Sequence, residues 1–149
     1  MYAKAFEEIR TALSKEKDPR RRISILTELS RIGQSSVEHT NLDAIKAVGE
    51  HLKVEDDPSV KKFGLGLLDA VIIDGPDISA MAAIEAIGNH MFEERVYDVW
   101  ARGLVTLKTC KEDYKVTAAI VTMERCMSKE DRPHLKMQMS LSFEGLVNF

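Results

Sequence analysis

Apolar residues recur along the chain at the three- and four-residue spacing of helices that turn one face towards a core. Charged and polar residues fill the positions between them, and helix-start and helix-stop residues interrupt the pattern repeatedly. The pattern predicts an all-α chain of eight helices, at about 2–14, 19–32, 42–52, 58–73, 77–91, 96–107, 110–127 and 133–146.

The helix expected after Asp57 has the clearest boundaries. The Asp57 side chain can accept hydrogen bonds from free backbone N–H groups, and Pro58 suits the first helical position because its missing N–H costs nothing there. Gly75-Pro76 cannot continue a helix and marks the end. Asp18-Pro19 repeats the same start signal nearer the N-terminus.

Two other helix starts are predicted from side-chain caps. Thr40 or Asn41 can cap the third helix after a loop at 34–40. Thr109 and Glu112 have the Thr-x-x-Glu spacing of a capping box, which predicts the start of the seventh helix.

The start signals and the apolar positions repeat along the chain. Asp18 and Asp57 lie 39 positions apart, Ile9, Val48 and Ile87 follow the same step, and the last step shortens to 36. Steps of this length are typical of helix-pair repeats. We therefore expect a single domain over residues 1–149, made of four helix pairs at about 2–33, 41–74, 77–108 and 110–147.

The second pair resembles a known repeat. Its second helix opens with the run Asp57-Pro58-Ser59-Val60-Lys61 and continues through small and leucine residues, namely Gly64, Leu67, Leu68 and Val71. This run is similar to the HEAT repeat of the armadillo/HEAT superfamily, whose inner helix typically begins Asp-Pro-x-Val-Arg. The resemblance implies a right-handed α-α superhelix of four HEAT-like helix pairs, used as a scaffold that docks protein partners.

The same resemblance implies a ladder of ion pairs between neighbouring units. Aligned on the second unit, the acidic column reads Asp18, Asp57, Glu93 and Arg132, and the basic column reads Arg22, Lys61, Tyr97 and Lys136. Arg132 and Tyr97 depart from the charges of their columns, so the ladder is expected to be interrupted there.

The last helix carries a conflicting pattern. Residues 135–143 alternate strictly between apolar and polar, which taken alone is typical of a strand. The repeat register favours a helix, because it places Leu135, Met139 and Phe143 on core positions. It leaves Met137 and Leu141 outside the core.

Composition narrows the classes of protein that fit. Hydrophobic residues at 44% and charged residues at 30% are ordinary for a globular chain, and a net charge of -3 gives no overall attraction to nucleic acid or anionic lipid. The longest apolar run, 63–73, is interrupted by Asp69 and is too short to span a membrane, and the N-terminus lacks a signal-peptide pattern. We expect a cytoplasmic protein.

The sequence shows no constellation that predicts catalysis. It has no nucleophile beside a base and no metal-ligand spacing, so we expect a non-enzyme without metal or cofactor. Cys110 and Cys126, 16 positions apart, are expected to be free thiols. His51 and His90 occupy equivalent positions, either as a metal-binding or pH-sensing pair or, the favoured interpretation, as half-exposed residues at helix ends.

The inner helical face of the superhelix, formed by the second helix of each pair, is the expected site for a protein or peptide partner. Exposed apolar residues mark such sites, and methionine adapts to irregular partners. The predicted contact residues are Lys62, Asp69, Asp98, Arg102, Met137 and Leu141. Self-association through the C-terminal unit is a further prediction.

The alternative is a helical-repeat protein that binds a nucleic-acid backbone. Its cations would be Arg20, Arg21, Arg22, Lys61 and Lys62. The mixed signs of charge on the second helices and the lack of interleaved aromatic residues make this alternative the less favoured one.

Overall fold

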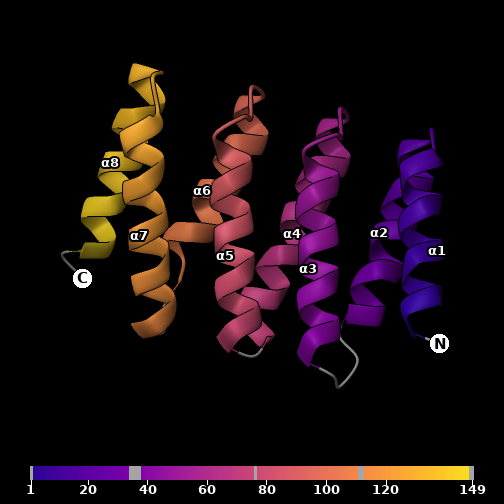
Figure 1. Ribbon diagram of the computed structural model, residues 1–149. Coiled ribbons are helices and arrows are strands. Elements are labelled where there is room, and N and C mark those ends of the chain that lie inside the picture. The colour runs from indigo at the N-terminus through magenta and orange to yellow at the C-terminus, as the bar shows by residue number, and fades with distance from the viewer. Residues whose placement is uncertain (1, 34–37, 76, 111–112, 148–149) are drawn as a thin grey trace.

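Eight helices, and no strand, form the part of the chain that the computed structural model describes, which comprises residues 2–33, 38–75, 77–110 and 113–147 (Figure 1). They are α1 (Tyr2–Lys15), α2 (Pro19–Gly33), α3 (Glu38–Leu52), α4 (Pro58–Asp74), α5 (Asp77–Met91), α6 (Tyr97–Lys108), α7 (Asp113–Lys129) and α8 (Pro133–Val147). The prediction of an all-α chain with eight helices is confirmed.

Helix α4 begins and ends as its sequence predicts. The Asp57 carboxylate accepts hydrogen bonds from the backbone N–H groups of Ser59 and Val60, at 2.8 and 3.1 Å. Pro58 takes the first helical position. At the other end, the N–H of Gly75 donates to the carbonyl oxygen of Val71.

Two predicted helix starts are wrong. Helix α3 already begins at Glu38, so Thr40 and Asn41 lie inside it and the loop predicted at 34–40 does not extend to residue 40. Thr109 ends α6 instead of starting α7, because its hydroxyl donates to the Thr106 carbonyl, one of the carbonyls that α6 leaves without an internal partner. Glu112, the other half of the expected capping box, lies outside the described residues.

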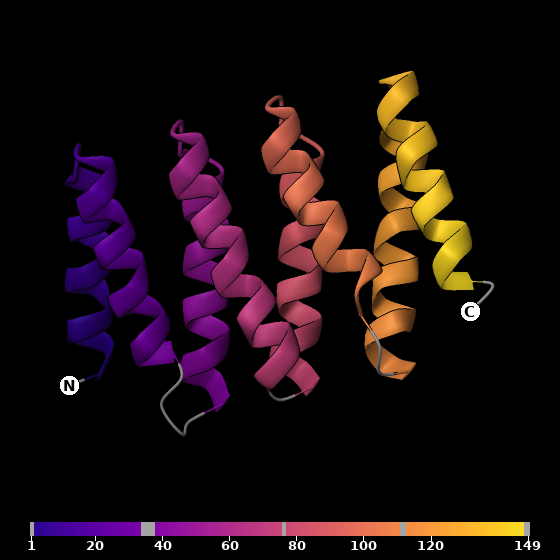
Figure 2. The same ribbon diagram turned by 180° about the vertical axis from the view of Figure 1, so that it is seen from behind.

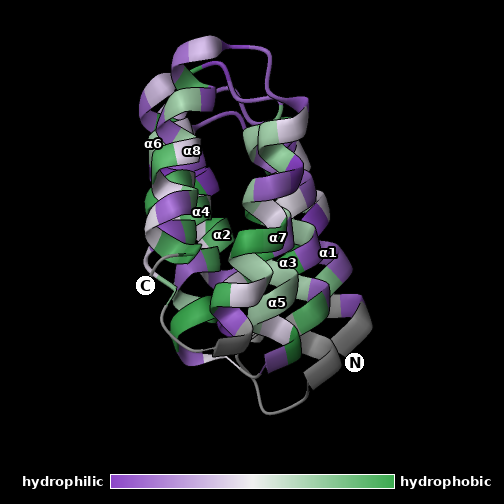
Figure 3. Ribbon diagram, turned by 90° about the vertical axis from the view of Figure 1, so that its left-hand side faces the viewer, coloured by the Kyte–Doolittle hydropathy of each residue, from purple (hydrophilic) through white to green (hydrophobic). Residues whose placement is uncertain are grey.

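The helices form two layers. Helices α2, α4, α6 and α8 pack in succession and form the even layer, while α3, α5 and α7 pack in succession beside α1 and form the odd layer. Figures 1 and 2 show the row from its two sides, with the chain ends at opposite ends of the row, and Figure 3 shows both layers end-on. We call the pairs α1–α2, α3–α4, α5–α6 and α7–α8 units one to four.

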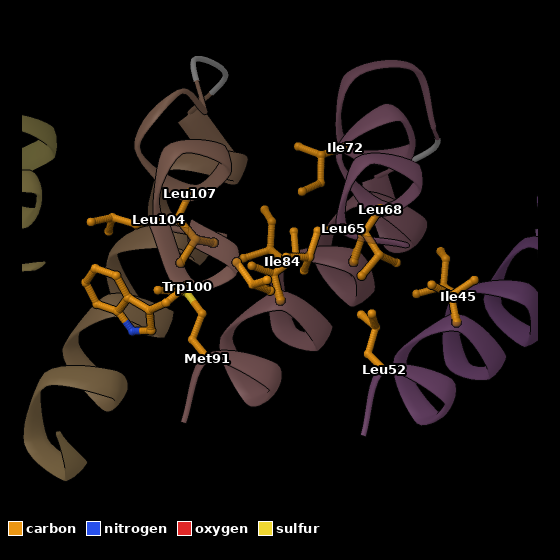
Figure 4. Close-up of a cluster of buried hydrophobic side chains, with 14 of the residues drawn as sticks. Ile45, Leu52, Leu65, Leu68, Ile72, Ile84, Met91, Trp100, Leu104 and Leu107 are labelled. Carbon is orange, nitrogen blue, oxygen red and sulfur yellow. The ribbon is translucent and has the colours of Figure 1, made fainter. Parts of the chain in front are cut away.

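A continuous apolar core fills the space between the layers. In Figure 4 side chains from α4, such as Leu65 and Leu68, meet side chains from α3 and α5, and Trp100 of α6 is buried close by. In α8, Leu135 and Met139 are buried and Phe143 packs against the core, which confirms that 135–143 is a helix despite its alternating pattern.

Candidate functional site

The contact between units one and two is built around the carboxylate of Glu55, in the turn between α3 and α4. Arg22 of α2 donates from Nε and Nη2 to its two oxygens, both at 2.8 Å. His51, one helical turn earlier, places Nε2 at 2.8 Å, and the N–H groups of Asp56 and Asp57 donate at 3.1 and 3.0 Å. This cluster is the first junction, and its acid is almost fully satisfied by donors.

Burial and hydrogen bonding act on Glu55 in opposite directions. Burial of its side chain, only 1% of which is exposed, raises the pKa of the carboxyl, but the hydrogen bonds from Arg22, the Asp57 amide and His51 together outweigh burial and hold the pKa below its ordinary value. The hydrogen bond to Glu55 raises the pKa of Arg22. The pair is therefore charged at neutral pH.

The second junction repeats the first one unit further along. Lys61 of α4 donates from Nζ to both oxygens of Glu94 at 3.1 Å, and His90 Nε2 lies 3.3 Å from the same carboxylate. The Glu94 side chain is fully buried. Burial lowers the pKa of His90 against the opposing pull of Glu94, so the ring is neutral at pH 7 and donates its Nε2–H to the carboxylate.

These junctions correct the expected ladder and the expected histidine roles. Asp57 is not a ladder member because it caps α4, and Glu93 is exposed; the acids are Glu55 and Glu94. His51 and His90 are not half-exposed but lie within these clusters with side chains only 10% and 6% exposed. The described residues contain no group of three or more histidines, cysteines and acids that could hold a metal ion.

One signal in the sequence could have identified these acids. Arg22 and Lys61, Glu55 and Glu94, and His51 and His90 all follow the same 39-residue step. A column of histidine four residues before a glutamate, in step with a basic column, predicts a shared cluster because residues at i and i+4 face one another on a helix.

The third junction, between units three and four, has a different chemistry. Arg132 takes both oxygens of Glu130 in its own unit, at 2.8 and 2.9 Å, and donates from Nη1 to the Glu94 carbonyl oxygen at 2.6 Å. Tyr97 occupies the basic column and donates its hydroxyl to Gln138 Oε1 at 3.0 Å. Cys126 occupies the histidine column and is buried. The predicted departures at Tyr97 and Arg132 thus coincide with this change.

Cys110 and Cys126 are both free and buried, as expected from their spacing. Burial raises the pKa of the Cys126 thiol to about 11, so it is protonated at neutral pH.

The six residues predicted to contact a partner lie on the even layer, on α4, α6 and α8. The structure brings Asp69 and Arg102 together, with Oδ2 and Nη2 3.6 Å apart, and places the Arg102 guanidinium 3.6 Å from where a Cβ on Gly66 would lie. Lys62 and Asp98 are exposed. A Cβ at position 66 would meet this guanidinium at an ordinary van der Waals distance, so the Asp69–Arg102 pair does not require glycine there.

Met137 and Leu141 lie one turn apart on α8, with 67% and 64% of their surface exposed. Four further exposed apolar residues of the even layer were not predicted, namely Ile73 on α4, Tyr97 and Val105 on α6, and Val147 on α8. Tyr97 and Val105, exposed by 47% and 42%, lie on the helix that packs beside α8. Register could have identified Val105, because it falls in the column of Asp69. We call Tyr97, Val105, Met137 and Leu141 the apolar patch.

The basic cluster of α2 does not form one cationic surface. Arg22 is committed to Glu55, and Lys61 of the same predicted set is committed to Glu94. Arg20 is exposed, and Arg21 is exposed with carboxylates of Glu16 and Asp18 at 3.9 and 4.0 Å.

None of the helices in the described residues is both long enough and apolar enough to cross a membrane. Comparison of the sequence with models of protein families found no match, and comparison with curated proteins found no relative.

Proposed function

We propose that this chain is a protein interaction scaffold, built as a right-handed α-α superhelix of HEAT type, which binds a protein or peptide through the outward surface of its even layer. The observation that carries the proposal is the exposure of Met137 and Leu141 by about two thirds, at helical spacing on α8. Covering these two large apolar side chains with a partner is favourable, because it removes their surface from water.

The surroundings of the apolar patch support a polypeptide partner. Asp98 and Lys62 are exposed beside the Asp69–Arg102 pair, so both signs of charge flank the patch. A rim of mixed charge around apolar contacts is typical of protein interfaces and gives them orientation. We expect the partner to place apolar side chains on Met137 and Leu141 and charged groups opposite Asp98 and Lys62.

The test begins with a photo-crosslinking amino acid at position 141, with the same group at Val121 of α7 as the matched control. Val121 is 58% exposed but lies in the odd layer. A partner joined from position 141 and not from 121 is then purified for a binding titration. The double change Met137→Ser and Leu141→Ser is expected to weaken binding by about 10- to 100-fold, as the loss of about 1.4–2.8 kcal/mol of apolar burial requires.

Equal affinity of the double variant and the unchanged chain would contradict the proposal. Circular dichroism of both proteins verifies that the exposed substitutions leave the helices intact. Light scattering on the same samples tests the prediction of self-association through the C-terminal unit, because a dimer formed there would be lost with these two side chains.

The nucleic-acid alternative stays a prediction, with fewer free cations than the sequence suggests. Arg22 and Lys61 are paired with buried carboxylates, which leaves Arg20, Arg21 and Lys62. A mobility shift at low salt tests it, because phosphate contacts strengthen as salt falls.

A further inference from the structure

A groove of about 770 Å³ separates unit one from unit two on the side of the turns. Its walls come from the end of α1, the start of α2, the end of α3 and the turn that follows α3. Figure 1 shows α1 and α3 as neighbours at the N-terminal end of the odd layer. The apolar patch lies on α6 and α8, so the groove is a different surface from the proposed partner face.

Helix packing along the odd layer changes beside the groove. A Cβ on Gly88 of α5 would lie 2.2 Å from Thr122 of α7, so glycine at this position lets these two helices pack closely. Arg10 of α1 and Gly49 of α3 occupy the equivalent positions, and the Arg10 guanidinium bonds Glu50 of α3 at 3.0 Å. Helices α1 and α3 pack less closely than α3 and α5.

The groove is acidic. Five carboxylates and three cations line it, and two of the carboxylates, Glu50 and Glu55, are already paired with Arg10 and Arg22. Each of the other three acids also has a contact. Glu16 accepts a hydrogen bond from the Lys17 N–H and lies 3.9 Å from Arg21, and Asp57 caps α4. Asp56 lies 3.7 Å from Arg22. Asp56 is the most available, with 96% of its side chain exposed.

Apolar surface accompanies these acids. Val54, two residues before Asp56, is 77% exposed, the largest value among the exposed large hydrophobic residues described. Leu13 and Ala47 contribute buried apolar side chains deeper in the groove, and Pro58 lies on its rim. A long aliphatic chain that ends in a positive charge fits both kinds of surface, because lysine and arginine bury their methylene stems and keep the charge in polar surroundings.

We propose that the groove between α1 and α3 binds a lysine- or arginine-containing segment of a partner polypeptide. The cation pairs with Asp56 and Glu16, and the methylene stem and a neighbouring apolar side chain cover Val54. The excess of carboxylates favours a basic segment over an acidic one, and the net charge of -3 makes a second copy of this chain the less favoured occupant.

The test is an NMR titration of the isotope-labelled chain with three peptides of ten residues. The first holds two lysines and two leucines among glycines and serines, the second replaces the lysines by glutamates, and the third replaces the leucines by serines. We expect the first to bind with amide shifts at Lys17, Val54 and Asp56, the second not to bind, and the third to bind more weakly.

Matched variants locate the effect. Asp56→Lys is expected to weaken binding of the first peptide about 5-fold or more, since charge reversal replaces an attraction by a repulsion. Asp131→Lys, at the equivalent exposed position of unit four, is expected to leave binding unchanged. Val54→Ser is expected to weaken binding and Val121→Ser to leave it unchanged.

Three results would overturn the proposal. One is equal binding of the lysine and glutamate peptides, a second is an equal loss from Asp56→Lys and Asp131→Lys, and a third is a set of amide shifts on α6 and α8 in place of the groove. A concentration-dependent dimer that Asp56→Lys abolishes would identify a second copy as the occupant and would also overturn it.

Discussion

The second and third junctions use different chemistry for the same contact between neighbouring units. At the second, a lysine from α4 reaches forward to a fully buried glutamate in the next turn, with a neutral histidine beside it. At the third, Arg132 reaches back from its own turn and donates to the carbonyl oxygen of Glu94. In both junctions one cation links two successive units. It comes from the earlier unit at the second junction and from the later unit at the third.

The repeat therefore keeps a buried carboxylate at the same position of each junction, whereas the cation that pairs with it comes from different positions. Glu94 and Glu130 occupy corresponding turns, and each has at least one cationic nitrogen within 3.1 Å. A buried carboxylate without a cation is costly, so loss of the basic residue at Tyr97 is compatible with the fold because Arg132 supplies the charge locally.

The largest expected effect comes from removing the acid of the second junction. Glu94→Ala leaves Lys61, whose side chain is 15% exposed, beside a buried neutral histidine, and is expected to lower the free energy of unfolding by about 2–4 kcal/mol. Chemical denaturation measures it. Glu130→Ala is expected to lower the free energy of unfolding by less, about 1–2 kcal/mol. Arg132 keeps its hydrogen bond to the Glu94 carbonyl oxygen, and its side chain, 19% exposed, is in contact with water.

The neighbouring glutamate is the control. Glu93 is exposed, so Glu93→Ala should change stability by less than about 0.5 kcal/mol. A larger loss from Glu93→Ala than from Glu94→Ala would mean that the junction uses the acid that alignment of the repeats suggests.

The next effect concerns helix spacing on the odd layer beside these junctions. A Cβ at Gly88 would lie 2.2 Å from Thr122 Cγ2, so Gly88→Ala is expected to destabilise the chain by about 1–3 kcal/mol. At Gly49 the nearest atom is the Ala86 Cβ at 3.5 Å, an ordinary contact, and Gly49→Ala is expected to be neutral or to stabilise by up to about 1 kcal/mol.

Thr122→Ser in the Gly88→Ala background tests the cause, because it removes the methyl group that clashes. Thermal unfolding is measured for the unchanged chain, for Gly88→Ala, for Thr122→Ser and for the double variant. The double variant should recover most of the stability that Gly88→Ala loses. No recovery would mean that the α5–α7 distance is set elsewhere.

The smallest effect is on the pH dependence of stability. His90 contributes to it at the second junction, whereas Cys126, which holds the equivalent position of the third junction, stays protonated at neutral and acidic pH. The pKa of His90 lies below 6.5 in the folded chain, so the unfolded chain binds a proton first as pH falls. Stability should therefore decrease below pH 6.5 and level off once pH passes the folded pKa of His90. Glu94, Lys61 and Glu93 are the charged groups that act on the ring.

His90→Gln keeps a donor for Glu94 and should remove this part of the pH dependence. The loss of stability at lower pH should remain, because the pKa values of Glu55 and Glu130 lie below 4.5 in the folded chain and their contributions disappear only as pH falls through those values. Denaturation midpoints between about pH 2 and 8 measure both parts, with His134→Gln, an exposed position, as control. An unchanged profile in His90→Gln would exclude the ring as its source.

The helices could be predicted because their apolar spacing and their start and stop residues agree, as at Asp57 and Gly75. The predictions from Thr40 and Thr109 were wrong because a threonine is not specific for the start of a helix. Thr40 lies inside α3, and Thr109 caps the C-terminal end of the preceding helix, α6. The expected ladder used the wrong acids because Asp57, already predicted as the cap of its helix, was also placed in the acidic column. The fold shows that Glu55, two residues earlier, pairs with Arg22 while Asp57 serves only as the cap.

The candidate face was predictable in part. Repeat register correctly left Met137 and Leu141 outside the core, since units two and three place the exposed residues Lys62 and Asp98 in the column of Met137. The groove was not predicted, because it depends on the absence of a close contact between α1 and α3. In the sequence this difference is accompanied by Arg10 at the position where α3 and α5 carry Gly49 and Gly88.

Unit two carries both halves of the charged junction, with Glu55 receiving Arg22 from the unit before and Lys61 reaching the unit after. A tandem copy of this 39-residue segment would therefore meet itself with matched charges. Head-to-tail contacts between units can extend into an open row. Duplication of one gene segment would thus lengthen the row by a whole helix pair and keep the charged cluster at the new boundary matched without a substitution in it.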